Sequence, residues 1–214
     1  MAWTLGEKPA KGKPVAAVAF CKSFIHFLIL LVYAELMRIV AGKHKGRKIE
    51  TPEGRDVRPT SARTREAVFN ILTHGRFGGE DGILLGGRVA DVFSGSGAMG
   101  LEALSRGAAQ VTFVDKSREA IEAVEYNVKK FGEDEHCRIL RADSSQLPKS
   151  PFPHDLIFMD PPYRTGLAYN SLQTALKGGW LRQGGIVVLE QAWKEPVKIP
   201  DTFEQVDERK YGNT

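Results

Sequence analysis

The chain has 214 residues, enough for one sizeable hydrophobic core with at most a small additional element. Hydrophobic residues make up 42% of the chain and charged residues 26%, which is typical of a globular protein. The only two cysteines, Cys21 and Cys137, argue against a disulfide framework or a metal cluster and fit a reducing, cytoplasmic compartment.

Positive charge is concentrated in one early segment. Residues 38–76 contain ten Lys or Arg and four Asp or Glu, a local charge of +6, whereas residues 77–214 contain 16 and 20, a local charge of −4. A cationic segment ahead of a nearly neutral body is common in proteins that bind polyanions. A solvated basic face would give the same counts, so charge alone leaves both interpretations open.

The first 36 residues differ from the rest. Lys8, Lys11 and Lys13 precede an apolar run of twelve residues at 23–34, SFIHFLILLVYA. This run is shorter than the roughly 20 residues that span a bilayer, although it resembles the core of a signal peptide. Three interpretations are open: an extension without an assigned role ahead of a functional start at Met37, an extra strand or helix packed on the domain, or an export signal. We expect the first, and no membrane segment.

Residues 37–76 are expected to form a basic arm. Residues 38–41 and 47–50 flank a glycine-bounded turn at 42–46, which predicts a small hairpin. A loop at 55–59 then leads into a predicted helix.

This helix is capped by Thr60 or Ser61 and runs to about Thr73. Its apolar face is expected to consist of Ala67, Val68, Ile71 and Leu72. Arg63 and Arg65 lie off that face, so we expect both to face solvent or a ligand.

From residue 88 onward, short apolar runs alternate with helical segments. Strands are predicted at 88–93, 110–115, 137–142, 155–159 and 186–190, and helices at 98–106, 117–131 and 167–178. This alternation predicts an α/β, Rossmann-like fold with a mostly parallel twisted sheet and helices on both faces. The expected organisation is an N-terminal extension (1–36), a basic arm (37–76) and a sheet domain (88–214).

A glycine-rich loop follows the first of these strands. Residues 91–100, DVFSGSGAMG, match the pattern G-x-G-x-x-G, and Asp115 ends the next strand about 20 residues after Gly95. The pattern alone fits NAD, FAD or S-adenosylmethionine, or only a tight strand-to-helix turn. Asp91 favours S-adenosylmethionine, because a carboxylate beside the loop would repel a pyrophosphate but attract an ammonium and a sulfonium.

Acidic residues end three successive predicted strands. Asp91 is placed for the methionine end of the cofactor, Asp115 for the ribose hydroxyls and Asp143 for the adenine amino group. Solvated strand-end acids are the alternative, above all for Asp143. The expected cofactor-binding residues are Asp91, Phe93, Ser94, Gly95, Gly97, Gly100, Asp115, Lys116, Asp143 and Ser144.

The fourth predicted strand leads into Asp160-Pro161-Pro162-Tyr163, the four expected catalytic residues. Two prolines fix an extended backbone and turn its carbonyls outward. The Asp160 carboxylate and the Pro161 carbonyl can accept hydrogen bonds from the exocyclic amino group of a base and stabilise the positive charge that develops on its nitrogen. Tyr163 offers a ring on which a flipped-out base can stack. Methyl transfer of this kind needs no metal, and a rigid Pro-Pro turn is the structural alternative.

The glycine loop, the strand-end acids and Asp160-Pro-Pro-Tyr163, in this order, resemble class I methyltransferases that act on exocyclic amines. The segments MRIVAGKHKGRK (37–48), RPT (58–60) and REAVFNIL (65–72) resemble the RsmD family of bacterial 16S rRNA guanine-N2 methyltransferases. LEALSRGA (101–108) also fits that family, and the resemblance extends from Met37 to Thr214.

The resemblance implies methyl transfer from S-adenosylmethionine to the N2 amino group of a guanine in 16S rRNA of the assembling 30S subunit. We also expect a cytoplasmic monomer without metal or membrane contact. The basic arm would then meet RNA phosphates, with solvation as the alternative for each residue. The expected RNA-binding residues are Lys43, Lys45, Arg47, Lys48, Arg58, Arg63 and Arg65.

Two segments depart from the family. The first 36 residues lie outside its pattern, and the sequence stops at KYGNT (210–214), where the family has a further strand inserted antiparallel into the sheet. We therefore expect an open slot in the sheet. One hypothesis is that residues 24–33, which are strongly strand-forming, fill it.

Other functions remain open. A DNA or other RNA amino-methyltransferase would carry the same catalytic motif, although the arm is small for reading a DNA sequence in the major groove. An NAD-dependent oxidoreductase would use the glycine loop and leave Asp160-Pro-Pro-Tyr163 without a role. A catalytically impaired RNA-binding assembly factor would bind RNA through the basic arm without transferring a methyl group.

Overall fold

The structure, a computed structural model, describes residues 2–5, 18–22, 37–52, 62–73, 77, 82–162, 165–192 and 198–211. The chain forms two compact units. We call them the glycine-loop unit, residues 25–141, and the Asp160 unit, residues 1–24 with 142–214. None of the helices in these described ranges has the length and apolar character required to cross a membrane.

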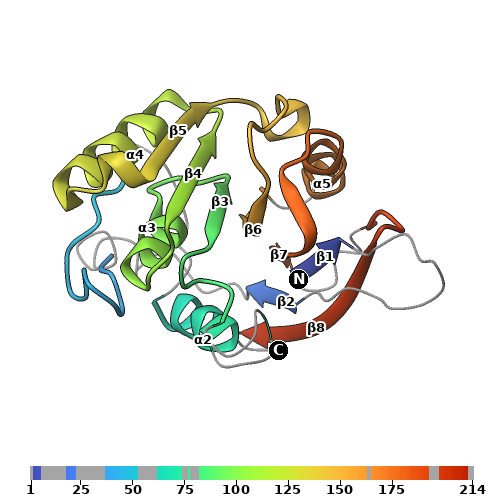
Figure 1. Ribbon diagram of the computed structural model, residues 1–214, viewed down its shortest axis with the longest axis horizontal. Helices are drawn as coiled ribbons and strands as arrows, with labels where there is room; N and C mark the ends of the chain where they lie inside the picture. The colour runs from blue at the N-terminus through green and yellow to red at the C-terminus, as the bar shows by residue number, and fades with distance from the viewer. Residues whose placement is uncertain are drawn as a thin grey trace. The chain divides into compact units, whose positions relative to one another are not determined.

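The glycine-loop unit is built on three parallel strands. These are β3 (Arg88–Val92), β4 (Gln110–Asp115) and β5 (Cys137–Arg141), which lie side by side in this order. Helix α3 (Ala98–Ser105) connects β3 to β4, and α4 (Arg118–Phe131) connects β4 to β5. Both helices pack against these strands, and Figure 1 shows them on the left of β3 and β4.

Local sequence accounts for these elements. Strands β3 and β4 are almost wholly buried because both of their faces are covered, whereas β5 is only partly buried. Helix α4 begins at Ser117, whose Oγ accepts a hydrogen bond from the Ala120 backbone N, and ends at Gly132 in the left-handed conformation. On α3, a Cβ at Gly100 would lie 2.3 Å from the ring of Phe113 on β4, so only glycine permits this approach.

The predicted hairpin is confirmed. Arg38 and Lys48 form an antiparallel bridge, and Ile39 N donates to Arg47 O at 3.0 Å. The hairpin is docked on its own unit, because Lys43 N donates to Ser105 O of α3 at 2.8 Å. It is therefore a fixed part of the glycine-loop unit.

The predicted helix after the hairpin is also confirmed, as α2 (Ala62–Thr73). Its buried residues are Thr64, Arg65, Val68, Phe69 and Leu72. Val68 and Leu72 agree with the prediction, whereas Ala67 and Ile71 are only half-buried. The expected caps, Thr60 and Ser61, and the predicted loop at 55–59 lie outside the described residues.

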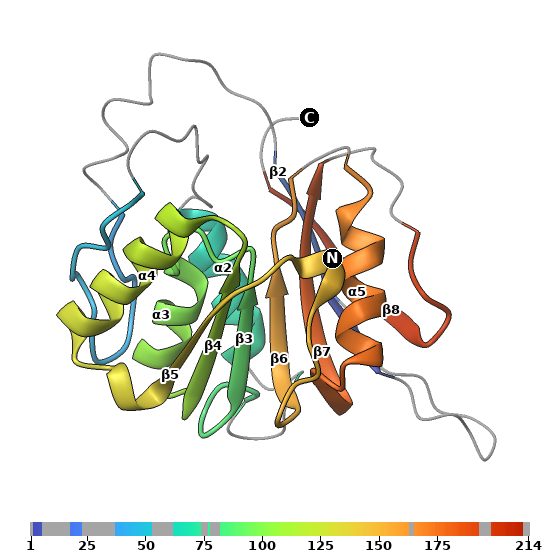
Figure 2. The same ribbon diagram turned by 90° about the horizontal axis from the view of Figure 1, so that it is seen from above.

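The Asp160 unit contains the remaining strands. Strand β6 (His154–Met159) pairs in parallel with β7 (Leu181–Ala192), and β8 (Phe203–Tyr211) is the last strand along the chain. Between β6 and β7 the chain forms α5 (Leu167–Lys177), which packs against β7, as Figure 2 shows. The predicted strand at 186–190 is thus longer in the structure, and the other predicted strands and helices agree closely.

Two short strands of the N-terminal segment fill the slot between β7 and β8. Strand β1 (Ala2–Leu5) pairs antiparallel with both neighbours, and β2 (Val18–Lys22) pairs in parallel with both. They follow one another along the slot, since Ala2 and Val18 both lie opposite Val188. The extra-strand interpretation is therefore the one that the structure supports, while the hypothetical filler at 24–33 lies outside the described residues.

Candidate cofactor and base-binding sites

The glycine loop leaves β3 with a strained backbone. Phe93 has a φ of 69°, the one positive value among the non-glycine residues that the structure describes. Phe93 N and Ser94 N both donate to Val114 O at 3.0 Å, which ties the loop to the end of β4. A residue held in this region costs about 1–3 kcal/mol and is typical of sites where the backbone must meet a ligand.

Asp91 lies buried at the end of β3 and supports the start of α3. Its Oδ2 accepts a hydrogen bond from Gly100 N at 2.9 Å, and the residue is 4% exposed. A carboxylate is favoured at this place because the N-terminus of a helix carries a partial positive charge. The role of Asp91 toward a cofactor stays a prediction.

Asp115 joins the glycine loop to the start of α4. Its Oδ2 accepts from Gly95 N at 3.0 Å, and its Oδ1 accepts from Ser117 N at 2.9 Å. The next residue, Lys116, is exposed. The half-buried carboxylate of Asp115 thus sets the loop conformation at the carboxyl end of β4, where ligands bind in this type of sheet.

Asn127, which sequence reasoning missed, connects the loop to the hairpin. Its side chain is fully buried on α4, and its Nδ2 donates to Ser96 O at 3.1 Å and to Glu50 O at 2.8 Å. Its Oδ1 accepts from Glu50 N at 2.9 Å. An asparagine inside an amphipathic helix gives no distinct signal, because its partners lie far away in the sequence.

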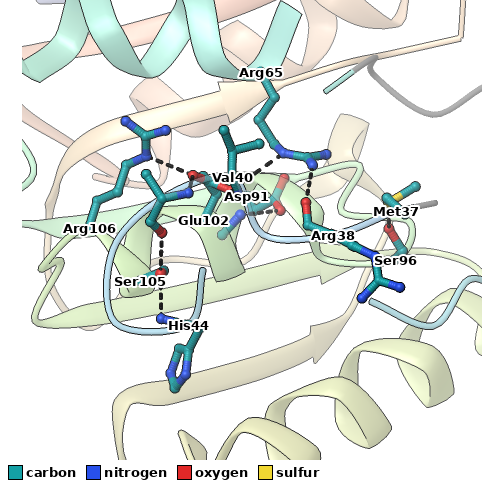
Figure 3. Close-up of polar contacts among 12 residues, drawn as sticks. Met37, Arg38, Val40, His44, Arg65, Asp91, Ser96, Glu102, Ser105 and Arg106 are labelled. Carbon is teal, nitrogen blue, oxygen red and sulfur yellow. Dashed lines mark hydrogen bonds and ion pairs between the residues drawn. The ribbon is translucent and has the colours of Figure 1, made fainter. Parts of the chain in front are cut away.

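Arg65 corrects one prediction, because its side chain is completely buried and does not face solvent or RNA. As Figure 3 shows, its Nη2 donates to Arg38 O at 2.5 Å and its Nε lies 3.6 Å from Glu102 Oε2. Burial lowers the pKa of the Arg65 guanidinium, while the nearby Glu102 carboxylate favours its charge. Periodicity places apolar residues on a buried face and cannot anticipate a charge that is paired inside it.

Glu102 is the centre of this buried network. Its carboxylate accepts hydrogen bonds from Val40 N at 2.7 Å and Arg106 Nε at 2.7 Å, as Figure 3 shows. It also accepts one from Ala41 N at 3.0 Å. The Arg106 guanidinium in turn lies 4.9 Å from the ring centroid of Phe69 on α2. The hairpin and α2 are thereby fastened to the helix that begins at the glycine loop.

Most of the basic hairpin residues have intramolecular partners. Lys43 Nζ lies 2.7 Å from Glu133 Oε1, which His44 also contacts. Burial raises the pKa of Glu133, but the hydrogen bonds from Lys43 and His44 outweigh it and hold the pKa below its ordinary value. Arg47 donates to the Phe131 carbonyl at 3.4 Å, and its guanidinium lies 4.4 Å from the centroid of that ring.

Four of the expected RNA-binding residues remain. Lys45 and Arg63 are exposed, and neither pairs with a carboxylate in the part of the chain that the structure describes. Lys48 Nζ lies 3.4 Å from Glu50 Oε2 at a half-exposed position. Arg58 lies outside the described residues.

In the Asp160 unit, Asp143 acts as a local cap. Its Oδ1 accepts from Ser145 N at 2.8 Å and from Ser145 Oγ at 2.6 Å, at the start of the turn η2 (Ser144–Gln146). The backbone carbonyl of Ser144 accepts from Thr174 Oγ1 of α5 at 2.8 Å. These hydrogen bonds give Asp143 and Ser144 a role in stabilising the local structure. The contact of Asp143 with adenine stays a prediction.

The Asp160-Pro-Pro segment follows β6 directly. Asp160 is half-buried, Pro161 buried and Pro162 exposed. Thr165 Oγ1 donates to Pro162 O at 2.7 Å, and Gly166 in the left-handed conformation turns the chain into α5. The segment is therefore held between β6 and α5, while Tyr163 lies outside the described residues.

Sequence reasoning also missed Glu190. Pairing of β6 with β7 sets Met159 opposite Leu189, so that Asp160 and Glu190 follow at the same level of the two strands. Glu190 is only 7% exposed. No motif marks this residue, because its position beside Asp160 depends on the strand register.

Among the residues that the structure describes, no group of three or more His, Cys, Asp or Glu could hold a metal ion.

Parallel strands joined by helices, with a glycine loop after one strand and an acid at the end of the next, define the Rossmann-like α/β class. The solved structure of the Escherichia coli protein yhhF, provisionally described as a methyltransferase, has a TM-score of 0.64 and 32% identity over 77% of this chain and 85% of that chain. The fold is therefore that of the class I methyltransferases. The chain belongs to the family described as Conserved hypothetical protein 95, whose model matches residues 37–214.

Two curated relatives carry one name, Ribosomal RNA small subunit methyltransferase D. The Escherichia coli K12 protein is 32% identical over 155 residues, which cover 72% of this chain and 74% of that protein. The Haemophilus influenzae protein is 29% identical over 180 residues, which cover 82% and 89%. The family resemblance drawn from the sequence motifs is thus confirmed.

Proposed function

We propose that the chain transfers a methyl group from S-adenosylmethionine to the exocyclic N2 amino group of a guanine in 16S rRNA of the small ribosomal subunit. The observation that carries the reaction is Asp160-Pro161-Pro162 at the carboxyl end of β6, in a chain with the fold of a methyltransferase. Membership of a family whose curated relatives are named for small-subunit rRNA supports the substrate.

The glycine loop fits S-adenosylmethionine as the methyl donor. Ser94 Oγ is buried without a hydrogen-bond partner among the described residues, and buried hydroxyls are normally bonded. A ligand above the loop would supply that bond and justify the strained Phe93 backbone. In this proposal Asp115 would take the ribose hydroxyls, Asp91 would favour the cationic end, and Asp143 would meet the adenine.

Asp160 and Pro161 would make the amino group reactive. The nitrogen of an exocyclic amine is a weak nucleophile because its lone pair is delocalised into the ring. Hydrogen bonds from the amino group to the Asp160 carboxylate and the Pro161 carbonyl localise that lone pair and stabilise the positive charge on nitrogen. When bound, S-adenosylmethionine would supply an electrophilic methyl group, and the nitrogen–carbon bond formed would balance the sulfur–carbon bond broken. The methylated nitrogen would then lose one proton to water or to the Asp160 carboxylate beside it.

The hairpin supports an rRNA substrate. Lys45 and Arg63 are exposed cations without a described carboxylate partner, and we assign them the most direct contacts with phosphate. Lys43, Arg47 and Lys48 add positive charge from paired positions. Arg65 is not included, because its side chain belongs to the core.

Methyl transfer from labelled cofactor to 30S particles, naked 16S rRNA and DNA tests the proposal. We expect label in ribosomal substrate, and a loss of about 100- to 1000-fold for Asp160→Asn, because the variant removes a charged acceptor at the reacting nitrogen. Asp134→Asn, the same change at an exposed position, is the control and is expected to keep wild-type activity. Equal labelling by Asp160→Asn, or label only in DNA, would contradict the proposal.

A further inference from the structure

Glu190 is a second carboxylate at the level of Asp160. Strands β6 and β7 are parallel, with Phe158 opposite Val188 and Met159 opposite Leu189. Side chains alternate between the faces of a strand, and neighbouring strands lie about 4.8 Å apart. Asp160 and Glu190 come one residue after the pair Met159 and Leu189. When the same alternation is extended to them, they lie on the same face of the sheet, on adjacent strands.

Glu190 is a buried carboxylate at the end of a run of buried apolar residues. The four residues before it in β7, Ile186 to Leu189, are all at most 5% exposed, and Glu190 itself is 7% exposed. A carboxylate in such surroundings is costly to bury, and even a paired one is seldom more stabilising than an apolar residue of similar size. Buried acids at the carboxyl ends of parallel strands are candidates for contacts with a ligand.

The two carboxylates match the hydrogen-bonding edge of guanine. Guanine presents two adjacent donors there, the N1–H group and the N2 amino group. Adenine presents an acceptor at N1, and cytosine presents an acceptor at N3. A carboxylate accepts hydrogen bonds and donates none when ionised, so it attracts the first edge and repels the other two.

We propose that Glu190 is the residue that selects guanine, by accepting a hydrogen bond from N1–H while Asp160 and Pro161 hold the N2 amino group. This inference rests on the proposed function and adds the choice of base to it. The N1 proton stays on the ring throughout, so Glu190 determines specificity and takes no part in proton transfer.

Replacement of the target guanine by 2-aminopurine isolates this contact. Both bases carry an amino group at C2, but 2-aminopurine has a lone pair at N1 where guanine has a proton. The guanine that the wild-type protein methylates is first mapped, and the RNA is then prepared with either base at that position. We expect the wild type to prefer guanine by about 10- to 100-fold in kcat/KM, the range for one base-reading contact.

Glu190→Gln is the decisive variant, because its amide can donate to N1 of 2-aminopurine. We expect it to lose activity on guanine, to gain on 2-aminopurine, and to bind S-adenosylmethionine with unchanged affinity. Glu208→Gln, the same change at an exposed position on β8, is the matched control and should keep the wild-type preference.

The possible results distinguish a failure of the proposed function from a failure of the role of Glu190 alone. If the wild type labels no RNA, the proposed function fails. If the wild type labels guanine and Glu190→Gln keeps its full preference over 2-aminopurine, only the role of Glu190 fails. Should Glu190→Gln not fold, Glu190→Asp is compared instead: it retains the acceptor and is expected to keep the guanine preference, and loss of that preference would overturn the inference.

Discussion

Two ion pairs of the glycine-loop unit have the same geometry and different surroundings. Glu102 with Arg106 and Arg118 with Glu122 are each four residues apart on a helix, and each joins its atoms at 2.7 Å. The side chain of Glu102 is 0% exposed, whereas that of Glu122 is 56% exposed. Burial therefore decides what each pair contributes to stability.

We expect Glu102→Gln to lower the free energy of unfolding by about 3–5 kcal/mol, because it leaves the buried Arg65 and the nearby Arg106 without a compensating charge. Glu122→Gln should leave the free energy of unfolding nearly unchanged, since exposed pairs are screened by water. Urea unfolding of both variants measures the difference. Equal effects would contradict the description of Glu102 as the centre of the network.

Residue-scale reasoning from sequence depends on how local the signal is. The place of Asp160 and the two prolines at the end of a strand could be predicted, because the motif directly follows the apolar run of β6, and their catalytic role stays a prediction. Arg65 was predicted wrongly because its burial depends on Glu102, a residue of another helix. Glu190 was missed because only the pairing of β6 with β7 brings it level with Asp160.

At the scale of elements, the packing of α3 on β4 controls the glycine loop. Gly100 approaches Phe113 so closely that a Cβ would lie 2.3 Å from the ring, and its backbone N donates to Asp91. The last glycine of the loop therefore serves helix packing as well as the turn.

We expect Gly100→Ala to destabilise the protein by about 1–3 kcal/mol, because the added methyl group forces α3 away from β4. It should also weaken binding of S-adenosylmethionine, since the Asp91–Gly100 hydrogen bond lies at the loop. Thermal unfolding and calorimetry measure the two effects. The double variant with Phe113→Leu removes the two closest clashing atoms, although Val111 Cγ1 remains 2.8 Å away, and should recover part of both losses. No recovery would refute crowding by the Phe113 ring as the cause.

Helices and strands could be predicted well, because their periodic apolar residues act within a few positions. The docking of the hairpin could not be predicted. It depends on contacts such as Lys43 N with Ser105 O and Asn127 with Glu50, which join residues far apart in the sequence. Charge suggested an arm, whereas the structure shows an element fixed to α3 and α4.

At the scale of the whole molecule, residues outside the matched family region complete a sheet. Strands β1 and β2 occupy the slot between β7 and β8, and the family model begins only at residue 37. Open strand edges expose unpaired backbone groups and invite association. The N-terminal segment is thus expected to contribute to stability as well as to solubility.

Phe20→Pro tests this contribution, because proline in a strand with neighbours on both sides removes a ladder hydrogen bond. We expect a lower melting temperature and increased light scattering. Phe20→Val, which keeps the backbone N–H group, is the control and should stay close to the wild type. A wild-type melting curve for Phe20→Pro would show that the slot does not need β2.

The slot between β7 and β8 also has a consequence for the order in which the chain folds. Val18 pairs with Asp207, so β2 can form this pairing only after β8, far later in the chain, has been made. The glycine-loop unit has no such dependence, since β3, β4 and β5 follow one another along the chain. During translation that unit can fold first, while the N-terminal strands remain without their final partners until β8 leaves the ribosome.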